Sequence, residues 1–238
     1  MQLEDYWKRW HTKPALREVY FDLHRRMMAV SVEGPALEIG GGIGNLASGD
    51  NSLIRIDIQA SLGVDIAADA HQLPFLDNTF ATIYLFDVLH HLQCPLLFFA
   101  EASRVLRPGG RLVMVEPGIT PLSRLLYGIG HEESVDLGWS PVTNCVPDPA
   151  KDPYASNQAI PTVLFKRAPQ WLAASGMPLR ILDVRWLSLF AYPLTGGFKS
   201  WSLIPVNWVA PLLRVEDFLL PLLGSVMGFR LLIAMEKE

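Results

Sequence analysis

The amino-acid sequence predicts an α/β domain in which helices cover both faces of a mostly parallel, Rossmann-like β-sheet. Two observations support this fold class: short apolar runs that alternate with loops and helical segments, and helical periodicity on both sides of that region. Short runs of β-branched and apolar residues alternate with loops and helical segments between residues 36 and 116. Such runs, apolar on both faces, are typical of parallel strands buried between two layers of helices. The expected strands of this region are 36–39, 53–57, 64–67, 82–86 and 111–116.

Helical periodicity flanks this region. Residues 4–30 repeat apolar side chains at helical intervals, and Pro14 divides them into two helices of an N-terminal cap, residues 1–35. A further helix is expected over 95–106, where Pro95 suits the first turn and the sequence Arg-Pro-Gly-Gly at 107–110 ends it. Beyond residue 161 the pattern predicts one more helix and two more strands, over 162–175, 180–188 and 229–235.

Residues 117–160 interrupt the periodic pattern. Seven of the 18 prolines lie between residues 117 and 161. A long aperiodic insertion is unusual in a compact domain unless it has a role, so we expect a lid over a substrate site. The whole chain, 1–238, is interpreted as one domain. It consists of the cap, a cofactor-binding core over 36–116, the lid, and a C-terminal part over 161–238 that completes the sheet and adds apolar helices.

Composition and charge exclude several classes of protein. A net charge of −4 without a basic block argues against nucleic-acid binding. Cys94 and Cys145 lie far apart in no metal-like spacing, so neither a disulfide nor a zinc site is expected, and a reducing cytoplasm is the expected compartment. The N-terminal residues lack the apolar run of a secretion signal, and charges and prolines interrupt the most apolar stretch, 201–235. No membrane-spanning helix is therefore expected.

The most informative motif is Leu-Glu-Ile-Gly-Gly-Gly-Ile-Gly-Asn-Leu at residues 37–46. Its glycines at 40, 42 and 44 follow the first expected strand, where a sharp turn and the close approach of a ligand to the backbone require small residues. A glycine-rich turn without a ligand is the alternative. The dinucleotide fingerprint would place its third glycine at position 45, which is Asn45, so the spacing disfavours that class.

Four further segments follow in the order that a nucleotide-binding α/β domain requires. Asp57 ends the second expected strand, at the edge where open α/β sheets bind ligands, and its carboxylate can accept both hydroxyls of a ribose. An aspartate at this place can also cap a turn. The sequence Asp-Ala-x-x-Leu-Pro-Phe at 69–75 comes next. Asp-Val-Leu-His-His-Leu at 87–92 and Leu-Arg-Pro-Gly-Gly at 106–110 then flank the expected helix.

Together these motifs resemble the class I S-adenosylmethionine-dependent methyltransferases, strongly over residues 36–116 and loosely elsewhere. The resemblance implies a seven-stranded sheet, S-adenosylmethionine as cofactor and S-adenosylhomocysteine as product. It also implies that the glycine loop passes under the methionine and ribose, and that Asp69 and the backbone of Ala70 contact the adenine. The cofactor-binding residues expected on this basis are Glu38, Gly40, Gly42, Gly44, Asp57, Ile58, Asp69, Ala70 and Asp87.

The segment after the glycine loop departs from the family pattern. Only 12 residues separate Gly44 from Asp57, so the helix between them must be short and is expected over 45–48. A short helix contributes a weak dipole, but S-adenosylmethionine has no phosphate that needs one.

Three histidines are candidate catalytic residues. Methyl transfer needs donor and acceptor held close and in line, and an oxygen or nitrogen acceptor can also need a base. His90 and His91, just past the fourth expected strand, suit this role, with His91 favoured; such a pair can instead cap a turn. His131, beside two glutamates in the lid, is the next candidate, although a polar trio in a loop commonly lies in solvent.

Glu116 is a further candidate residue, and the histidine pair raises the question of metal binding. Glu116 is expected at the same edge of the sheet, where it either binds substrate or caps the turn at Pro117-Gly118. His90 and His91 are adjacent and expected to point in different directions, and no carboxylate is suitably spaced in the sequence for a metal triad. No metal is therefore expected.

Residues 186–228 are rich in tryptophan, phenylalanine and leucine. Packing against the edge of the sheet explains most of this pattern. The alternative is an amphipathic surface that contacts a lipid-linked substrate or the inner membrane. The sequence at 116–123 is similar to bacterial methyltransferases of polysaccharide and glycoconjugate pathways. The expected function is thus methyl transfer to an oxygen or nitrogen of a small or lipid-linked metabolite, in the cytoplasm or peripherally at the inner membrane.

Two other functions stay open at this point. A nicotinamide-dependent oxidoreductase would bind a nicotinamide cofactor in place of S-adenosylmethionine. A non-catalytic binding protein would bind S-adenosylmethionine without turnover, and substitution of both His90 and His91 would have no consequence.

Overall fold

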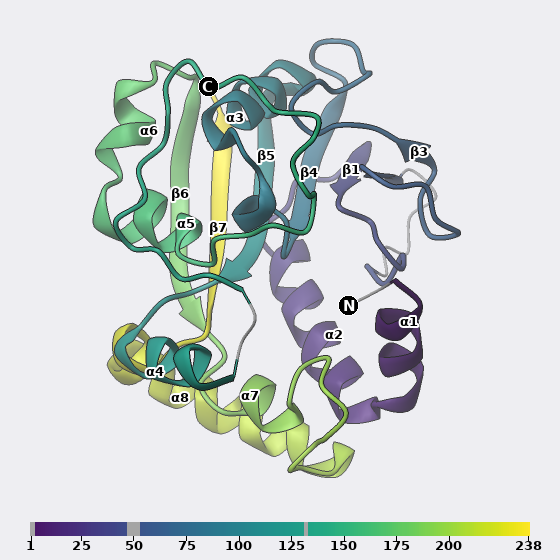
Figure 1. Ribbon diagram of the computed structural model, residues 1–238, viewed down its shortest axis with the longest axis vertical. Helices are drawn as coiled ribbons and strands as arrows, with labels where there is room; N and C mark the ends of the chain where they lie inside the picture. Colours follow the sequence, from purple (N-terminus) through teal and green to yellow (C-terminus); the bar gives the residue numbers. More distant parts are fainter. Residues whose placement is uncertain (1–2, 47–52, 131–132) are drawn as a thin grey trace.

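The computed structural model describes residues 3–46, 53–130 and 133–238. Its centre is a seven-stranded sheet with the strand order β3-β2-β1-β4-β5-β7-β6 (Figure 1). The strands from β3 to β5 are parallel, and β7 runs antiparallel to both β5 and β6. This arrangement confirms the predicted mostly parallel, Rossmann-like sheet. The strands are β1 (Ala36–Ile39), β2 (Leu53–Asp57), β3 (Ile66–Ala67), β4 (Phe80–Phe86), β5 (Leu106–Pro117), β6 (Leu179–Leu187) and β7 (Arg230–Lys237).

The central strands are apolar because helices cover both faces of the sheet. In β4 every residue from Phe80 to Leu85 is buried, which explains why its sequence is continuously apolar rather than alternating. β1 pairs in register with both of its neighbours, so that Leu37 lies between Ile54 of β2 and Ile83 of β4. β5 begins five residues before its expected start, because the Arg-Pro-Gly-Gly segment continues the strand across a register shift opposite Phe80.

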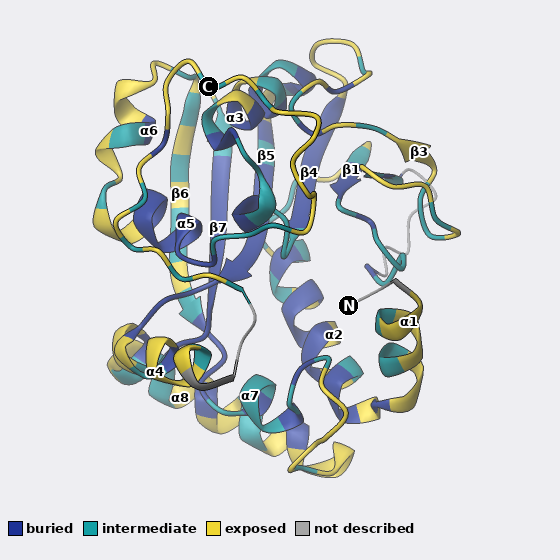
Figure 2. Ribbon diagram, viewed as in Figure 1, coloured by how far each residue is buried: buried dark blue, intermediate teal, exposed yellow. Residues whose placement is uncertain are grey.

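Two layers of helices enclose the sheet. One layer holds α3 (Pro95–Val105), α5 (Ile160–Thr162), a π-helical turn (Val163–Arg167) and α6 (Gln170–Ala174). Phe98, Phe99 and Phe165 of this layer pack on the sheet in one buried cluster. The other layer holds α2 (Pro14–Met28), α7 (Ala191–Thr195) and α8 (Val209–Met227), with a second cluster beneath them. Figure 2 shows that the central strands are buried, whereas α6 and α8 each have an exposed face.

Two segments differ from the sequence prediction. The aperiodic insertion contains a helix, α4 (Pro121–Gly130), because Pro121 occupies the first turn, where no backbone N–H is needed. The single helix expected over 162–175 is broken into α5, the π-helical turn and α6. Pro169 accounts for the second break, because proline cannot donate the backbone hydrogen bond that a continuous helix requires.

Several helices gather at the end of the sheet where the parallel strands terminate. Figure 1 shows α1 (Leu3–Thr12), α4, α7 and α8 at this end. The Lys13 ammonium, between α1 and α2, donates to the carbonyl oxygens of Thr195 at 2.6 Å and of Lys199 and Trp201 at 2.9 Å, and also to that of Gly197. These bonds fix the N-terminal helices to the segment after α7. Across the described residues, no helix is both long and apolar enough to cross a bilayer.

Candidate cofactor and acceptor site

The glycine loop turns sharply at the carboxyl end of β1. The N–H groups of Gly40 and Gly41 both donate to the carbonyl oxygen of Ile56 in β2 at 2.9 Å, so the loop is fixed to the neighbouring strand. Gly40 has a positive φ of 75°, and a Cβ atom there would lie 2.2 Å from a methyl group of Val88. Only glycine fits this position. A Cβ on Gly42 would instead meet no atom closer than 3.7 Å, so this part of the loop is open.

Asp57 lies beside the glycine loop, as predicted. Its Oδ2 accepts the N–H of Gly42 at 3.0 Å and its Oδ1 accepts the N–H of Gln59 at 3.1 Å. Ile58 follows with 54% of its surface exposed. The structure therefore places the open backbone at Gly42 next to the Asp57 carboxylate, with Ile58 directly after it, as the sequence predicted.

Ser61 and Gly63 support the loop from the far side, and neither was identified from the sequence. The Ser61 hydroxyl donates to the carbonyl oxygen of Gly42 at 2.7 Å. A Cβ atom on Gly63 would lie 2.6 Å from the backbone nitrogen of Gly44, so glycine is required for this close approach. An isolated glycine between two short strands is a signal that could have identified Gly63.

Glu38 lies beneath the loop rather than at its surface. Its side chain is buried and its Oε2 is 3.2 Å from Nε of Arg55 in β2. Burial raises the pKa of Glu38 to about 8, although the nearby Arg55 guanidinium acts in the opposite direction. Glu38 thus supports the base of the loop, and its direct contact with the cofactor stays a prediction.

The predicted adenine-binding segment is a turn with Asp69 at its start. Asp69 Oδ1 accepts the N–H of His71 at 2.9 Å and lies 2.7 Å from Nδ1 of the same histidine. The Asp69 side chain is nearly half exposed, which leaves its other oxygen accessible, whereas Ala70 is buried against the sheet. The short helix expected over 45–48 is absent at Asn45 and Leu46, and residues 47–48 lie outside the described residues.

Asp87, which follows β4, is held by a residue that the sequence analysis missed. Its carboxylate accepts two hydrogen bonds from the guanidinium of Arg230, at 2.5 and 2.9 Å. Arg230 is buried under the rings of Tyr192, Phe86 and Tyr20, at 4.2, 5.1 and 5.8 Å. Because Arg230 comes from β7, 143 residues away in the chain, no local pattern connects it to Asp87.

The two predicted catalytic histidines lie on a 3₁₀ turn, Leu89–His91, next to Asp87. Glu116 of β5 is fully buried and fixes this turn, because its Oε1 accepts the N–H groups of Val88 and Leu89 at 2.8 Å. Its Oε2 lies 2.7 Å from Nδ1 of His90. Glu116 therefore fixes the turn after β4 and not the turn at 117–118 that was expected, where the N–H of Gly118 donates to the carbonyl oxygen of Phe229.

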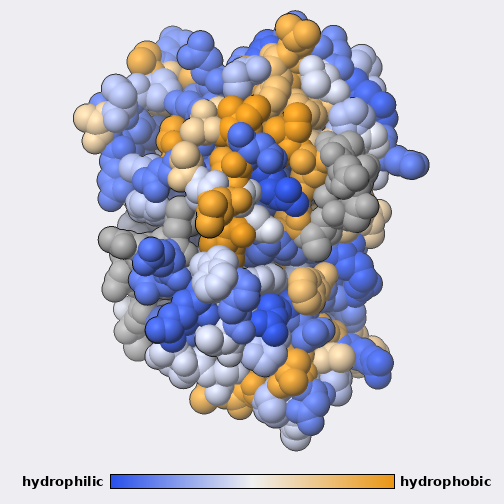
Figure 3. All heavy atoms as spheres, turned by 90° about the vertical axis from the view of Figure 1, so that its right-hand side faces the viewer, coloured by the Kyte–Doolittle hydropathy of each residue, from blue (hydrophilic) through white to orange (hydrophobic). Residues whose placement is uncertain are grey.

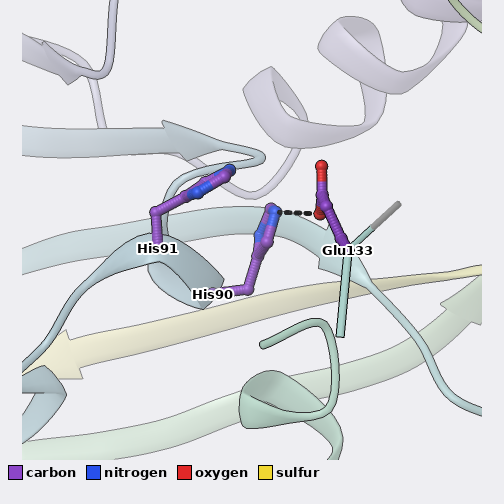
Figure 4. Close-up of side chains that lie close together, drawn as sticks. All are labelled: His90, His91 and Glu133. Carbon is purple, nitrogen blue, oxygen red and sulfur yellow. Dashed lines mark ion pairs between the residues drawn. The ribbon is translucent and has the colours of Figure 1, made fainter. Parts of the chain in front are cut away.

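Glu133 of the lid completes the cluster. Its Oε2 lies 3.6 Å from Nε2 of His90 and accepts a hydrogen bond from Gln158 at 2.9 Å. The ring centroids of His90 and His91 lie 4.2 Å apart, and Nε2 of His90 faces Glu133 (Figure 4). The expectation that no carboxylate could join the histidine pair was wrong, since the lid brings Glu133 to them. His131 lies outside the described residues.

Charge within the cluster is distributed unevenly. Burial opposes the charged form of His90, but hydrogen bonds with Glu116 and Glu133 outweigh it and raise the pKa of His90 to about 10. Burial and the neighbouring charge of His90 lower the pKa of His91. Burial and then the charges of Glu133 and Asp87 raise the pKa of Tyr6 to about 12. The carboxylates of Glu133 and Asp87 thus act electrostatically on Tyr6 of α1.

A disulfide fastens the lid beside the histidines, which corrects the expectation of two unpaired cysteines. Cys94 and Cys145 are bonded across 51 residues, with Cα atoms 5.5 Å apart. Next to them, the side chain of Gln93 exchanges two 2.9 Å hydrogen bonds with the backbone of Asp148. The argument for a reducing compartment rested on the absence of a disulfide, so it loses that support.

Comparisons with known proteins agree with this geometry. Residues 37–114 match the family described as "Methyltransferase domain". A demethylmenaquinone methyltransferase of Mycobacterium sp. (strain KMS) is 30% identical over 135 residues, which are 57% of this chain and 54% of that protein. A 27-O-demethylrifamycin SV methyltransferase of Amycolatopsis mediterranei is 43% identical over 47 residues, 20% of this chain and 17% of that protein. The chain thus spans about half or less of the length of these relatives.

Solved structures share the whole architecture. A SAM-dependent methyltransferase of Thermotoga maritima, described as a possible histamine N-methyltransferase, has a TM-score of 0.60 with 17% identity, covering 98% of this chain and 95% of that one. A geranyl diphosphate C-methyltransferase of Streptomyces coelicolor, solved with S-adenosyl-L-homocysteine, has a TM-score of 0.57 with 14% identity, covering 91% and 78%. At these low sequence identities, the structural similarity establishes a shared fold and nothing further. Residues 37–114 are thus similar to a methyltransferase domain, and the chain shares the fold of S-adenosylmethionine-dependent methyltransferases.

Proposed function

We propose that the protein transfers the methyl group of S-adenosylmethionine to an oxygen or nitrogen atom of a small metabolite. The observation that carries this proposal is the open glycine loop at Gly42 with the Asp57 carboxylate beside it. The cofactor would be held by Glu38, Gly40, Gly42, Gly44, Asp57, Ile58, Asp69, Ala70 and Asp87. Figure 3 shows hydrophobic surface in the upper half of the face that contains α1 and β3, and the exposed Ile58 suits packing on an adenine.

The acceptor would lie between the histidine turn and the helices at the carboxyl end of the sheet. Methyl transfer is an in-line displacement: the bond from sulfur to the methyl carbon breaks while the acceptor atom bonds to that carbon. We propose that His91 and His90 act on the acceptor, because they follow β4 directly and lie close to Glu133. His131 stays a third candidate.

Ligand titration tests the cofactor assignment. Calorimetry with S-adenosylhomocysteine should give one site per chain, whereas NAD⁺ and NADP⁺ should give no heat of binding. Binding of a nicotinamide dinucleotide instead would contradict the proposal and favour an oxidoreductase. Methyl-labelled S-adenosylmethionine incubated with fractionated bacterial metabolites should yield a labelled product. Tight binding with no labelled product from any fraction would indicate a non-catalytic binding protein.

We further propose that the acceptor is lipid-linked, for example a glycoconjugate precursor, and that the protein contacts the membrane peripherally. The supporting observation is a set of exposed apolar side chains on α4 and α8, which contact each other at the end of the sheet near the site. Such a surface suits an amphipathic helix in a lipid interface. We call it the α4–α8 face, and its exposed members are Leu125, Leu126, Val215, Phe218, Leu222 and Val226.

Liposome flotation tests the membrane contact. We expect the protein to float with vesicles of bacterial polar lipids, and the double variant Phe218→Ser/Leu222→Ser to lose most of this binding because both side chains are more than 70% exposed. The matched control is Leu76→Ser, an equally exposed leucine away from α4 and α8. Failure of the wild type to float, or equal loss in the control, would contradict the contact without affecting the proposed chemistry.

A further inference from the structure

We propose that His90, His91 and Glu133 bind a divalent cation of the zinc type. Each of the three side chains offers one ligand atom, and these atoms all lie within 4.8 Å of one another. The residues come from two segments, the turn after β4 and the lid, so that the cluster exists only in the folded protein (Figure 4). Two imidazoles and one carboxylate are a ligand set that zinc prefers when a fourth position stays open to a reactant.

Glu116 gives His90 the orientation of a metal ligand. Its Oε1 is occupied by two backbone N–H groups and its Oε2 lies 2.7 Å from Nδ1 of His90. A carboxylate saturated in this way accepts the Nδ1 proton and leaves Nε2 directed toward Glu133. Metal-bound histidines almost always have such a carboxylate or carbonyl behind their other nitrogen. His90 is 97% buried, so its orientation is fixed by the protein and not by solvent.

The distances suit a cation with little rearrangement. Two ligands at about 2.0–2.1 Å from a tetrahedral zinc ion lie roughly 3.3 Å apart. Nε2 of His90 and Oε2 of Glu133 are already 3.6 Å apart. Gln158 orients Glu133 by donating to that oxygen at 2.9 Å. His91 adds a second observation, because its Nδ1 is buried and has no hydrogen-bond partner among the described residues.

The charges of the cluster also balance with a divalent cation. Asp87 is neutralised by Arg230, which leaves the two carboxylates of Glu116 and Glu133 around the imidazoles. The proposal departs from the expectation of a protein without metal, which rested on the spacing of carboxylates in the sequence and on two adjacent histidines expected to point in different directions.

The role of the cation in the reaction rests on the proposed function, whereas its binding does not. At its open position the cation would bind the hydroxyl oxygen of the acceptor, and it would favour loss of the hydroxyl proton to water. That oxygen then bonds to the methyl carbon as the carbon–sulfur bond breaks, and S-adenosylhomocysteine leaves. The substrate class indicated is an alcohol or phenol whose oxygen can ligate zinc.

Cobalt and zinc titrations of the purified chain test the site without an acceptor. We expect one Co²⁺ per chain, with the visible absorption of four- or five-coordinate cobalt, and displacement by Zn²⁺. Glu133→Gln and His91→Asn should each weaken Co²⁺ binding by about 100-fold or more. Glu116→Gln should weaken it by about 10- to 100-fold, as substitutions behind a metal ligand do. His11→Asn, an exposed histidine on α1, is the matched control and should leave the titration unchanged.

S-adenosylhomocysteine binding is measured on the same samples. Retained binding in the variants shows that they are folded, and it is independent of the cation. No stoichiometric Co²⁺ uptake, or uptake that His11→Asn reduces as much as Glu133→Gln, would overturn the metal site. Cation binding with no affinity for S-adenosylhomocysteine would instead contradict the proposed function and leave the metal site standing.

Discussion

Substitution of Asp57 by alanine should lower the affinity for S-adenosylhomocysteine by about 100- to 10,000-fold. The proposed ribose contact consists of two hydrogen bonds to a charged acceptor, each worth roughly 1.5–3 kcal/mol. The same carboxylate also accepts the N–H of Gly42, so its removal loosens the loop that binds the cofactor. Calorimetric titration of wild type and variant measures the change directly.

Asp77→Ala is the matched control for this result. Asp77 is an exposed aspartate in the loop before β4, and its carboxylate bonds to Arg104 rather than to the glycine loop. We expect its affinity for S-adenosylhomocysteine to stay within about twofold of wild type, since a surface ion pair contributes little to a distant site. If Asp57→Ala and wild type bind S-adenosylhomocysteine equally well, Asp57 does not contact the ribose. The main observation behind the proposed function would then be lost.

Arg230→Met should lower the free energy of unfolding by about 3–5 kcal/mol, the cost of leaving one partner of a buried ion pair alone. Arg230 is buried beneath three aromatic rings, and its guanidinium neutralises Asp87, which has a strained φ of 57°. This loss is a large fraction of the roughly 5–15 kcal/mol that stabilises an ordinary domain. Urea unfolding of both proteins gives the difference.

The double variant Arg230→Met/Asp87→Asn separates the ion pair from simple packing. We expect it to be more stable than the sum of the two single variants predicts, because removing both charges leaves neither unpaired. Arg180→Met, on β6, is the surface control and should cost less than about 1 kcal/mol. A strictly additive double variant would show that Arg230 stabilises the fold by packing alone.

The strands and turns of the core could be predicted because each is specified by residues that are close together in the sequence. Each strand from β1 to β4 is a short run that ends in a turn, and the residue at its end, such as Asp57, lies at the proposed ligand-binding edge. The glycine loop was predicted for the same reason, since spacing and an adjacent strand suffice to define it. Pro121 was read as a sign of irregular structure, although at the first turn of a helix it is favourable.

The acceptor side depends on contacts between distant parts of the chain. His90 could be named from its place after β4, but its partner Glu133 comes from the lid and its partner Glu116 from β5. The Cys94–Cys145 bond is of the same kind, because spacing alone cannot show that a lid folds back onto the start of α3. Arg230 was missed because a charged residue at the start of an apolar strand gives no sign of its partner.

The position of β7 has a consequence for how the chain reaches its native state. β7 follows β6 in sequence, yet it lies between β5 and β6 and pairs with both. Until residues 230–237 have been synthesised, β5 has an open edge and β6 has no neighbour in the sheet. Unpaired edges of this kind favour aggregation and slow the final ordering of a nascent chain. Translation must therefore pass the last strand before Asp87 acquires its guanidinium partner and the ligand-binding end of the domain can close.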